Sequence, residues 1–555
     1  MPRNILLEIS YILPKCTFQH LKQIHALIFT ASLTQELQLF SKFLRRSTEF
    51  GSMDYSNIIL SQMGDHYFNS ETMLWNIMIR GYSFNGPSEK CISMFDEMSQ
   101  RELKPNNYTY PYVLNSCCQL RRYSKGKRVH CQIIKSGFES SFAVSHALFN
   151  MYIKRPGFVD IGGAGNHKLS DARRVFDDMF ERPVEVWNMM IYEYVSFGEV
   201  GCARKLFETM PQRDVVSWNS MISGYVKAGE VENARRMFEL MPEKSVISWT
   251  LMIELYKDAS NLEAARGFFE RMPQRNVVSW NSMISCYTKH GKFRETLDLF
   301  VQMQSEGVIP DGYTFVSVLS ACSNLGDLEY GKYVHCLLGD FSEMEVMVGT
   351  ALIEMYAQCG DVNTSFAMFI KIPNKDIFCW NVMIRCLAIN GRTEDAVKIF
   401  FSAQKVGVKP NDFTFTSALF ACSHGGLVEE TRRIFYSMEN DYKISPKIEH
   451  FACLIDLLSR NGQLEEALLV LKDMPFEPDI AIWGSLLGGC SITNNLNMVE
   501  KTIKRVCELE TEDSGVYVLL SNIYASECRW QEAQGARGKM EEKKIRKETG
   551  SSIVF

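Results

Sequence analysis

Val215 to Ser245 reads VVSWNSMISGYVKAGEVENARRMFELMPEKS, and this stretch decides the fold. Apolar residues recur in it at helical spacing in two stripes: Trp218, Ile222 and Tyr225, then Ala234, Met237, Phe238 and Met241. Gly229 lies between the stripes as a turn, and Pro242 closes the second stripe because proline cannot continue a helix. The stretch therefore predicts a helical hairpin whose Trp, Ile, Ala and Phe side chains pack in a core.

The same pattern repeats along the chain. A spacing of 31 residues separates four Trp residues: Trp187, Trp218, Trp249 and Trp280. Trp75 and Trp380 begin further units, and Trp483 begins a diverged one. Neither helix of a unit is long enough to be stable alone, and each hairpin leaves an apolar face for the next hairpin to cover. The repeat predicts an α-solenoid.

Composition agrees with a stack of repeats. The 555 residues carry 60 Lys and Arg against 65 Asp and Glu, a formal charge of −5, and 46% are apolar. A single core stops growing near about 250 to 300 residues, so a longer chain divides into domains or repeats. No run approaches the roughly 18 apolar residues of a membrane span, so no membrane insertion is expected. The acidic balance argues against nucleic-acid binding through bulk positive charge.

Cysteine and histidine give no sign of a metal site or a cofactor. The 17 Cys residues form no C-x-x-C pair, which favours reduced thiols that act as buried filler. Lys127 to Cys131 and Lys332 to Cys336 share a K-x-V-H-C element, echoed around His25. The His residues could suggest a metal site, but they lie in separate repeats without a local partner. Helix packing is the favoured interpretation, and no metal is expected.

The repeat lengths fit two families of helical hairpins, which differ in the residue four places after Trp. The units of 31 residues are 184–214, 215–245, 246–276 and 346–376; those of 35 are 72–106, 277–311 and 377–411; those without Trp are 107–141 and 312–345. The tetratricopeptide pattern fits in part, but it has Gly four residues after Trp, where this chain has Ile. The motifs VVSWNSMISGY, VMVGTALIEMYAQCGDV and YVLLSNIYA resemble the pentatricopeptide repeat family, PLS subclass.

This resemblance implies an all-α fold, a right-handed α-solenoid superhelix of stacked helix-turn-helix repeats. It divides the chain into a short N-terminal segment with a possible targeting role (1–17), diverged repeats (18–71), an array of alternating 35-residue, longer and 31-residue motifs (72–479, with an insertion near 155–167), and a C-terminal E-type helical-hairpin domain (480–555). Members of the family bind single-stranded RNA, one base per repeat, through the fifth and last residues of each unit and an apolar second residue.

Transferred to this sequence, the rule assigns RNA-binding residues. The pairs are Asn76 with Asn106, Asn188 with Asp214, Asn219 with Ser245, Thr250 with Asn276, Asn281 with Asp311, Thr350 with Asp376, and Asn381 with Asn411. The family code reads them as Y-N-N-U-C-A-U-N-G-Y-N-N, from 5′ to 3′, where N is an unread base. An Asn near a helix start is also a common cap, and this alternative stays open for each pair.

Some units depart from the pattern. The unit that begins at Phe142 has His146 in fifth place and a Gly-rich insertion, so no base is assigned to it. The unit 184–214 has Glu185 where an apolar residue should meet the base. The units without Trp, together with the unit that begins at Asp412, have Pro111, Val316 and Thr416 in fifth place. These three are interpreted as spacers or weak readers.

The C-terminal motifs EPDIAIWGSLLGGC and YVLLSNIYASECRWQEA resemble the E domain of the editing-type members. That resemblance implies organellar C-to-U editing, which needs a Zn-bound water and the signatures H-x-E and P-C-x-x-C. Neither signature is present, so no catalytic residue and no enzyme activity are expected. The leading hypothesis is a site-recognition factor that recruits a DYW-type deaminase in trans, with other editing factors. The alternatives are a factor in organellar splicing, stability or translation, and a tetratricopeptide-like protein-binding scaffold.

The resemblance also implies an organellar protein. The first twenty residues hold Arg3, Lys15 and one acidic residue, Glu8, which is acid-poor but short of Arg and Ser for a transit peptide. A mitochondrion is favoured over a chloroplast. By the family's alignment rule the last unit lies on the fourth nucleotide upstream of the edited C, which predicts the target Y-N-N-U-C-A-U-N-G-Y-N-N-N-N-N-C.

Overall fold

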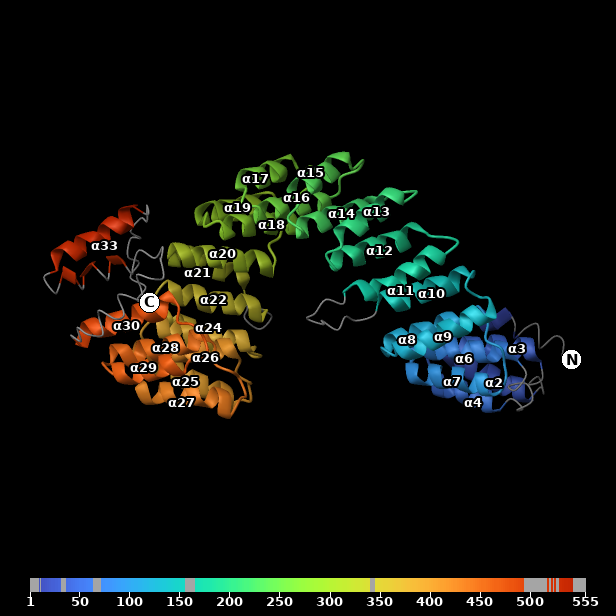
Figure 1. The fold of residues 1–555 in the computed structure, drawn as a ribbon. Coiled ribbons are helices and arrows are strands. Elements are labelled where there is room, and N and C mark those ends of the chain that lie inside the picture. The colour runs from blue at the N-terminus through green and yellow to red at the C-terminus, as the bar shows by residue number, and fades with distance from the viewer. Residues whose placement is uncertain are drawn as a thin grey trace. The chain divides into compact units, whose positions relative to one another are not determined.

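The computed structural model describes residues 9, 11–30, 36–62, 71–154, 165–339 and 345–493, and then 517–518, 521–522, 524–525 and 529–542. All regular structure in these ranges is helical, with 29 α-helices and no strand (Figure 1). The expected all-α solenoid of helical hairpins is confirmed. The chain divides into two units, residues 1–259 and 260–555. Most of the predicted N-terminal segment, most of the insertion and most of the C-terminal domain lie outside the described residues.

Paired helices build the first unit. A 3-10 turn at Leu13–Lys15 and helices α2 (Phe18–Thr30), α3 (Leu37–Glu49) and α4 (Met53–Ser61) precede the hairpins. The hairpins are α6 (Thr72–Asn85) with α7 (Ser88–Gln100), α8 (Tyr110–Gln119) with α9 (Tyr123–Ser136), α10 (Phe142–Ile153) with α11 (Gly165–Asp178), α12 (Val184–Ser196) with α13 (Val200–Thr209), and α14 (Val215–Lys227) with α15 (Val231–Leu240). Helix α16 (Val246–Asp258) ends the unit.

The second unit continues in the same way. It begins with α17 (Leu262–Arg271) and holds α18 (Val277–Lys289) with α19 (Phe293–Ser305), α20 (Gly312–Leu325) with α21 (Leu328–Leu338), α22 (Val346–Gln358) with α23 (Val362–Lys371), α24 (Ile377–Ile389) with α25 (Thr393–Lys405), α26 (Asp412–Gly425) with α27 (Val428–Asn440), and α28 (Ile448–Arg460) with α29 (Leu464–Asp473). Helices α30 (Ile480–Thr493) and α33 (Trp530–Glu542) follow.

The hairpin of α14 and α15 has the turns that its sequence predicts. Helix α14 ends at Lys227, and Gly229 takes a φ of +70°, a backbone conformation that glycine adopts without steric cost. Helix α15 ends at Leu240, where Met241 leaves the helical conformation directly before Pro242. Ile222 and Ala234 are fully buried between the helices. Hairpin boundaries therefore follow from the Gly and Pro positions.

An aromatic contact joins consecutive repeats at five places in the array. The Trp of one repeat meets the Phe of the preceding second helix edge-to-face, with ring centroids 4.7 to 4.9 Å apart, in five pairs: Phe176–Trp187, Phe207–Trp218, Phe238–Trp249, Phe269–Trp280 and Phe369–Trp380. Such pairs contribute about 0.5 to 1.5 kcal/mol beyond their buried area. The predicted core role is confirmed for the five Phe residues and for Trp187, Trp280 and Trp380, which are buried, whereas Trp218 and Trp249 are partly buried.

A basic residue completes each of these contacts. The second-to-last residue of the repeat places its cation over the same Phe ring, as Arg213 does at 4.9 Å from the centroid of Phe207. Arg213 also donates to the carbonyl oxygens of Phe207 and Glu208, at 2.8 and 2.9 Å, at the end of α13. The same position holds Arg182, Lys244, Arg275 and Lys375 over their Phe rings. The cation therefore caps the helix end, where carbonyl groups lack partners.

The histidines of the K-x-V-H-C elements pack between helices. The Nδ1 atoms of three His residues lie 2.8 to 2.9 Å from Tyr hydroxyls, in the pairs His25–Tyr55, His130–Tyr152 and His335–Tyr356. In two of them, His130 and His335, the Tyr lies on the first helix of the next repeat. The favoured helix-packing interpretation is confirmed for these residues.

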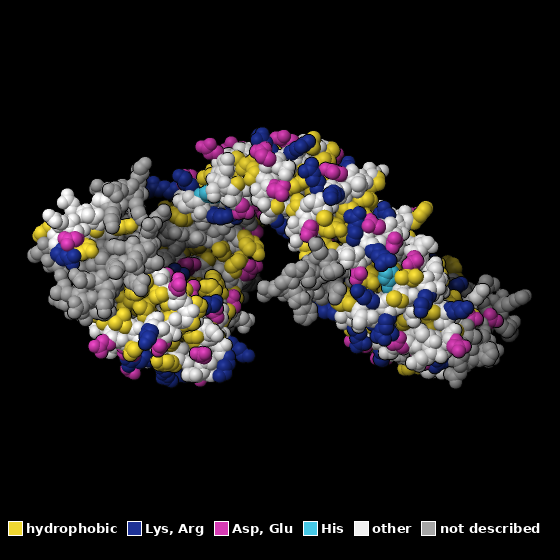
Figure 2. Space-filling model, viewed as in Figure 1, with side chains coloured by type: hydrophobic (Ala, Val, Ile, Leu, Met, Phe, Trp, Pro, Cys, Tyr) yellow, Lys and Arg dark blue, Asp and Glu magenta, His cyan; other side chains and the backbone are white. Residues whose placement is uncertain are grey.

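Charges of both signs are interspersed over the surface, as Figure 2 shows for one face. Many are paired within a helix four residues apart, such as Arg204 with Glu208 and Arg235 with Glu239, both at 2.9 Å. Exposed pairs of this kind contribute about 0.3 to 0.5 kcal/mol each. Both pairs lie on exposed sides of second helices, α13 and α15.

Candidate nucleic-acid interface

The fifth residue of a repeat and its last residue meet in five of the seven predicted pairs. The amide Nδ2 of the fifth residue donates to the last one: Asn76 to Asn106 at 3.1 Å, Asn188 to Asp214 at 3.0 Å, Asn219 to Ser245 at 3.2 Å, Asn281 to Asp311 at 2.8 Å, and Asn381 to Asn411 at 3.2 Å. The fifth residue lies in the first turns of its helix. The last residue directly precedes the first helix of the next repeat in four of these pairs, whereas a turn separates Asn106 from α8, which begins at Tyr110.

The last residue also starts that next helix. The side-chain oxygen of Asp214 accepts from the backbone N–H of Ser217 at 2.8 Å, and that of Asp311 accepts from Thr314 at 3.0 Å. Ser245, Asn276, Asp376 and Asn411 cap the following helices in the same way. Capping therefore belongs to the last residues, whereas the fifth residues lie inside their helices. The alternative interpretation as caps holds for the last residues of six pairs, but not for Asn106, because the N-cap of α8 is Thr109.

A hydroxyl of the following repeat joins three of the pairs. The third residue of that repeat donates to the Oδ1 of the fifth residue: Thr109 to Asn76 at 2.5 Å, Ser217 to Asn188 at 2.7 Å, and Thr314 to Asn281 at 2.6 Å. In the two other pairs, the Oδ1 atoms of Asn219 and Asn381 are buried and accept no hydrogen bond from the described residues. These hydroxyls were not predicted from the sequence, although Ser or Thr recurs in third place.

Two pairs are arranged differently. Thr350 donates its hydroxyl to the carbonyl oxygen of Val346 in its own helix at 2.8 Å, while Asp376 caps α24. Thr250 likewise donates to Val246 at 2.8 Å. Its partner Asn276 belongs to the second unit, whereas Thr250 belongs to the first. A Thr side chain is shorter than Asn, and its hydroxyl is satisfied within the helix.

An exposed apolar side chain precedes the fifth residue in most repeats. The second residue is between 43% and 74% exposed in eight units: Met73, Tyr108, Val216, Ile247, Val278, Tyr313, Phe378 and Phe413. Residues two and five are three apart and therefore share one face of the helix. Glu185 is exposed at the equivalent place in its unit, as the sequence indicates. Apolar surface beside a hydrogen-bonding amide is the chemistry that holds an unstacked base.

The carboxyl groups of Asp214 and Asp311 are ionised at neutral pH. Burial raises the pKa of Asp214, but hydrogen bonds from Ser217 and Asn188 outweigh burial and hold the pKa below its ordinary value. Asp311 behaves in the same way, because bonds from Thr314 and Asn281 outweigh its burial and lower its pKa. Each carboxylate therefore only accepts hydrogen bonds, and it fixes the amide of its Asn partner with the nitrogen toward it.

The fifth residues of the other units offer fewer hydrogen-bonding groups to a base. Pro111 has no side-chain hydrogen-bonding group, and neither has Val316. Thr416 lies within 3.1 Å of the Nε2 of His450 and donates to Asp412 at 3.0 Å, so its hydroxyl is already engaged. His146 lies 3.2 Å from the amide of Asn150 on the same helix. The interpretation of Pro111, Val316 and Thr416 as spacers or weak readers stays a prediction, and no base is assigned to the unit of His146.

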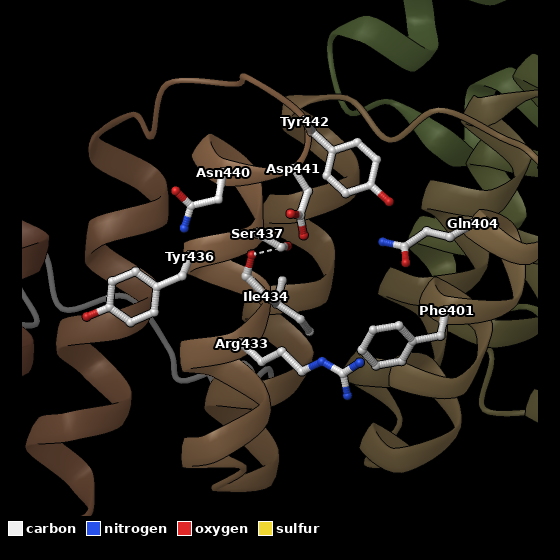
Figure 3. A pocket seen from close by; sticks show the side chains of 9 residues that line it. All are labelled: Phe401, Gln404, Arg433, Ile434, Tyr436, Ser437, Asn440, Asp441 and Tyr442. Atoms are coloured by element: carbon white, nitrogen blue, oxygen red, sulfur yellow. Dashed lines mark hydrogen bonds between the residues drawn. The ribbon is translucent and has the colours of Figure 1, made fainter.

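A cavity of about 330 Å³ lies apart from these pairs, between α25 and α27. Its lining comprises Phe401, Gln404, Arg433, Ile434, Tyr436, Ser437, Asn440, Asp441 and Tyr442 (Figure 3). The guanidinium of Arg433 lies 5.1 Å from the ring centroid of Phe401. None of the fifth or last residues contributes to it. Within the described ranges, no cluster of three or more potential metal ligands occurs, and no helix has the length and apolarity of a membrane span.

Comparison with known proteins identifies the family. Models of the PPR repeat match residues 185–215, 216–246, 247–277, 413–441 and 449–477, and a related PPR repeat family model matches 71–119, 275–324 and 375–424. The pentatricopeptide repeat-containing protein At3g29230 of Arabidopsis thaliana is 42% identical over 100% of this chain and 90% of its own length. This chain belongs to the pentatricopeptide repeat family. The E motif model matches residues 493–555, consistent with the E-type PLS subclass.

Other pentatricopeptide repeat proteins give the same picture. The Arabidopsis thaliana protein At5g15300 is 38% identical over 96% of this chain and 90% of its own length. The crystal structure of the pentatricopeptide repeat protein PPR10 from maize has a TM-score of 0.61 at 15% identity, covering 98% of this chain and 89% of that one. The structure of PPR10 in complex with an 18-nt psaJ RNA element has a TM-score of 0.59 at 16% identity, covering 92% and 85%. These likenesses confirm the fold.

Proposed function

We propose that this pentatricopeptide repeat protein binds single-stranded RNA sequence-specifically and selects a site for organellar C-to-U editing. The observation that carries the proposal is the recurring arrangement of an Asn amide, its hydrogen-bonded last residue and an exposed apolar second residue. Each such unit offers a donor and an acceptor to a base edge, with apolar surface beside them. The fourteen residues of the seven pairs are the proposed RNA contacts, including Thr250, Asn276, Thr350 and Asp376.

Three further findings support the proposal. PPR10, which shares this fold, is named in a complex with an RNA element. The E motif at residues 493–555 favours editing over splicing, stability or translation, because the resemblance ties that motif to editing-type members. Two relatives are named chloroplastic/mitochondrial and mitochondrial, which supports an organellar location. The proposed mechanism has a DYW-type deaminase supplied in trans.

Binding to a designed RNA tests the proposed sequence-specific RNA binding. The purified chain is titrated with an RNA that carries Y-N-N-U-C-A-U-N-G-Y-N-N and with one in which the readable bases are scrambled, at one fixed salt concentration. Base contacts discriminate by about 1 to 3 kcal/mol each, so scrambling several of them is expected to weaken binding at least tenfold. Equal binding to both RNAs would disprove the base assignment, and no RNA binding would favour the protein-scaffold alternative.

Loss of the gene tests the proposed role in C-to-U editing. We expect a C fourth downstream of the matching sequence to stay unedited in an organellar transcript, while the abundance and splicing of that transcript are unchanged. Editing restored by the full chain but not by a variant with Asn281→Ala and Asn188→Ala would link the base-reading residues to the site. Unchanged editing together with altered splicing or abundance would favour the alternative role.

A further inference from the structure

The fifth residues fall into two classes, although their sequence pairs look alike. Asn76, Asn188 and Asn281 are held at both ends of the amide, since Nδ2 donates to the last residue and Oδ1 accepts a hydroxyl. Asn219 and Asn381 are held through Nδ2 alone, and their buried Oδ1 atoms lack a partner among the described residues. The difference originates in the third residue of the following repeat.

Third residues of the same type direct their hydroxyls differently. The hydroxyl of Thr314 lies 2.6 Å from the Oδ1 of Asn281 and 3.0 Å from Asp311. Thr414 is the third residue of the unit that begins at Asp412, as Thr314 is of the unit 312–345. Its hydroxyl, however, donates to Asn411 at 2.9 Å. Ser248 donates to the backbone oxygen of Ser245 at 2.7 Å. In all three cases the backbone N–H of the third residue donates to the side chain of the preceding last residue, so the helix starts in the same way. The bond to the fifth residue is therefore a separate feature.

We propose that the third residue of the following repeat is a positioning residue for base recognition, and that its hydroxyl sets how sharply the fifth residue discriminates between bases. This inference rests on the proposed RNA-binding function. A hydroxyl on Oδ1 and an acceptor on Nδ2 fix the plane of the amide, which leaves one N–H and one lone pair in a set orientation for the base. With one anchor, the plane of the amide can rotate about the remaining hydrogen bond, and where the last residue both donates and accepts, the amide can also turn over.

Two repeats with the same pair allow a direct comparison. Asn76 with Asn106 and Asn381 with Asn411 are both Asn–Asn pairs, for which the family rule implies the same mixed pyrimidine preference. Thr109 anchors Asn76, whereas no hydroxyl anchors Asn381. The repeat 72–106 is therefore expected to distinguish uracil from cytosine more sharply than the repeat 377–411. The two residues of the pair alone predict no such difference.

Substitution of the hydroxyl provides the decisive experiment. Affinities of the full chain are measured for four RNAs that differ only in the base opposite the repeat 277–311. Thr314→Val is expected to reduce the preference for uracil about 3- to 10-fold, the range of one lost hydrogen bond, while preferences at other positions persist. Thr314→Ser keeps the hydroxyl and is expected to restore the preference.

Thr414→Val is the matched control. Thr414 accepts the N–H of Asn411 at 3.1 Å, as Thr314 accepts that of Asp311 at 3.1 Å, so both variants lose the same capping bond. The control should leave discrimination opposite the repeat 377–411 unchanged. If Thr314→Val folds poorly, Ser217→Ala in the unit after 184–214 makes the same comparison.

The outcomes separate this inference from the function on which it rests. If wild-type protein discriminates at no position, the proposed base reading fails, and the third residue has nothing to position. If wild-type protein discriminates but Thr314→Val discriminates equally well, the positioning role is overturned. Equal losses in Thr314→Val and Thr414→Val would overturn it too, because the shared loss of the cap would then explain both.

Discussion

At the scale of single residues, the last residue of four repeats both bonds the fifth residue and caps the next helix with one side chain. The Oδ1 of Asp311 accepts the N–H of Thr314, which starts α20, and it also accepts the amide of Asn281. Its carboxylate is shared between a helix of one repeat and the surface of the repeat before it. Stability and recognition can therefore be separated only by substitutions that keep one function.

Asp311 can be tested in this way. Asp311→Ala removes the cap and is expected to lower the free energy of unfolding by about 1 kcal/mol, whereas Asp311→Asn keeps an acceptor and should cost a few tenths. Urea unfolding followed by circular dichroism measures both values. Equal losses in the two variants would show that the negative charge, rather than the cap, stabilises the start of α20.

At the scale of elements, five second helices are followed by a cation that also covers an aromatic ring. Arg213 donates to two carbonyl oxygens at the end of α13 and lies over Phe207, which in turn meets Trp218. A chain of cation, Phe and Trp thereby runs from one hairpin into the next. This arrangement replaces the glycine that often ends helices, because Met210 leaves the helix in an extended conformation.

Removal of that cation should cost more than removal of an ordinary surface charge. We expect Arg213→Ala to lower the unfolding free energy by about 1 to 2 kcal/mol, since it removes two hydrogen bonds and a cation–π contact. Arg235→Ala removes only an exposed, solvent-screened pair with Glu239 and is expected to lower it by less. Thermal unfolding of both variants provides the comparison. Similar shifts would mean that the contact with Phe207 adds nothing.

The His–Tyr pairs give the helices a pH dependence. Burial is the largest cause that lowers the pKa of His25, His130 and His335 below the ordinary value of 6.5. A lowered pKa means that the unfolded chain binds more protons near pH 6, so stability is full above about pH 6.5 and falls as the pH drops below it.

Replacement of the three histidines by asparagine tests this dependence. We expect the unfolding free energy of wild-type protein to fall more steeply between pH 7 and pH 5 than that of the variant with His25→Asn, His130→Asn and His335→Asn. The slope is the readout, since the lost ring packing lowers stability by the same amount at every pH. Parallel slopes would show that other groups carry the dependence.

At the scale of the whole molecule, contacts stay local in the sequence. The larger contacts between described helices join helices no more than two places apart, such as α24 with α26 and α20 with α22. Stability in such an array is a sum of repeat and nearest-neighbour terms, so damage at one repeat should remain near it.

Trp280 is suited to a test of this locality because it is fully buried. Trp280→Ala is expected to cost about 3 to 5 kcal/mol and to accelerate amide hydrogen exchange in α17, α18 and α19. Helices α28 and α29, in the same unit, should keep their wild-type exchange rates. Uniformly faster exchange throughout the unit would show that it unfolds as one cooperative body.

The sequence predicts the repeat well and the links between repeats poorly. Gly229 and Pro242 mark the ends of helices through their own backbone chemistry, so the hairpin was predictable. The meeting of Asn188 with Asp214 was predictable only through the family resemblance. The bond from Ser217 to Asn188 joins atoms 29 residues apart, and recurrence reveals the position without its partner. The pairing rule also did not predict that the hydroxyl of Thr350 donates within its own helix.

The double role of the last residue restricts how a lineage of these proteins can acquire new targets. Mutation can exchange Asp, Asn, Ser or Thr at that place and still begin a helix, but most other side chains would weaken the fold before they offered a new letter. The choice of last residues open to natural variation, or to a protein engineer who changes the base preference of one repeat, is thus limited by helix initiation as much as by RNA binding.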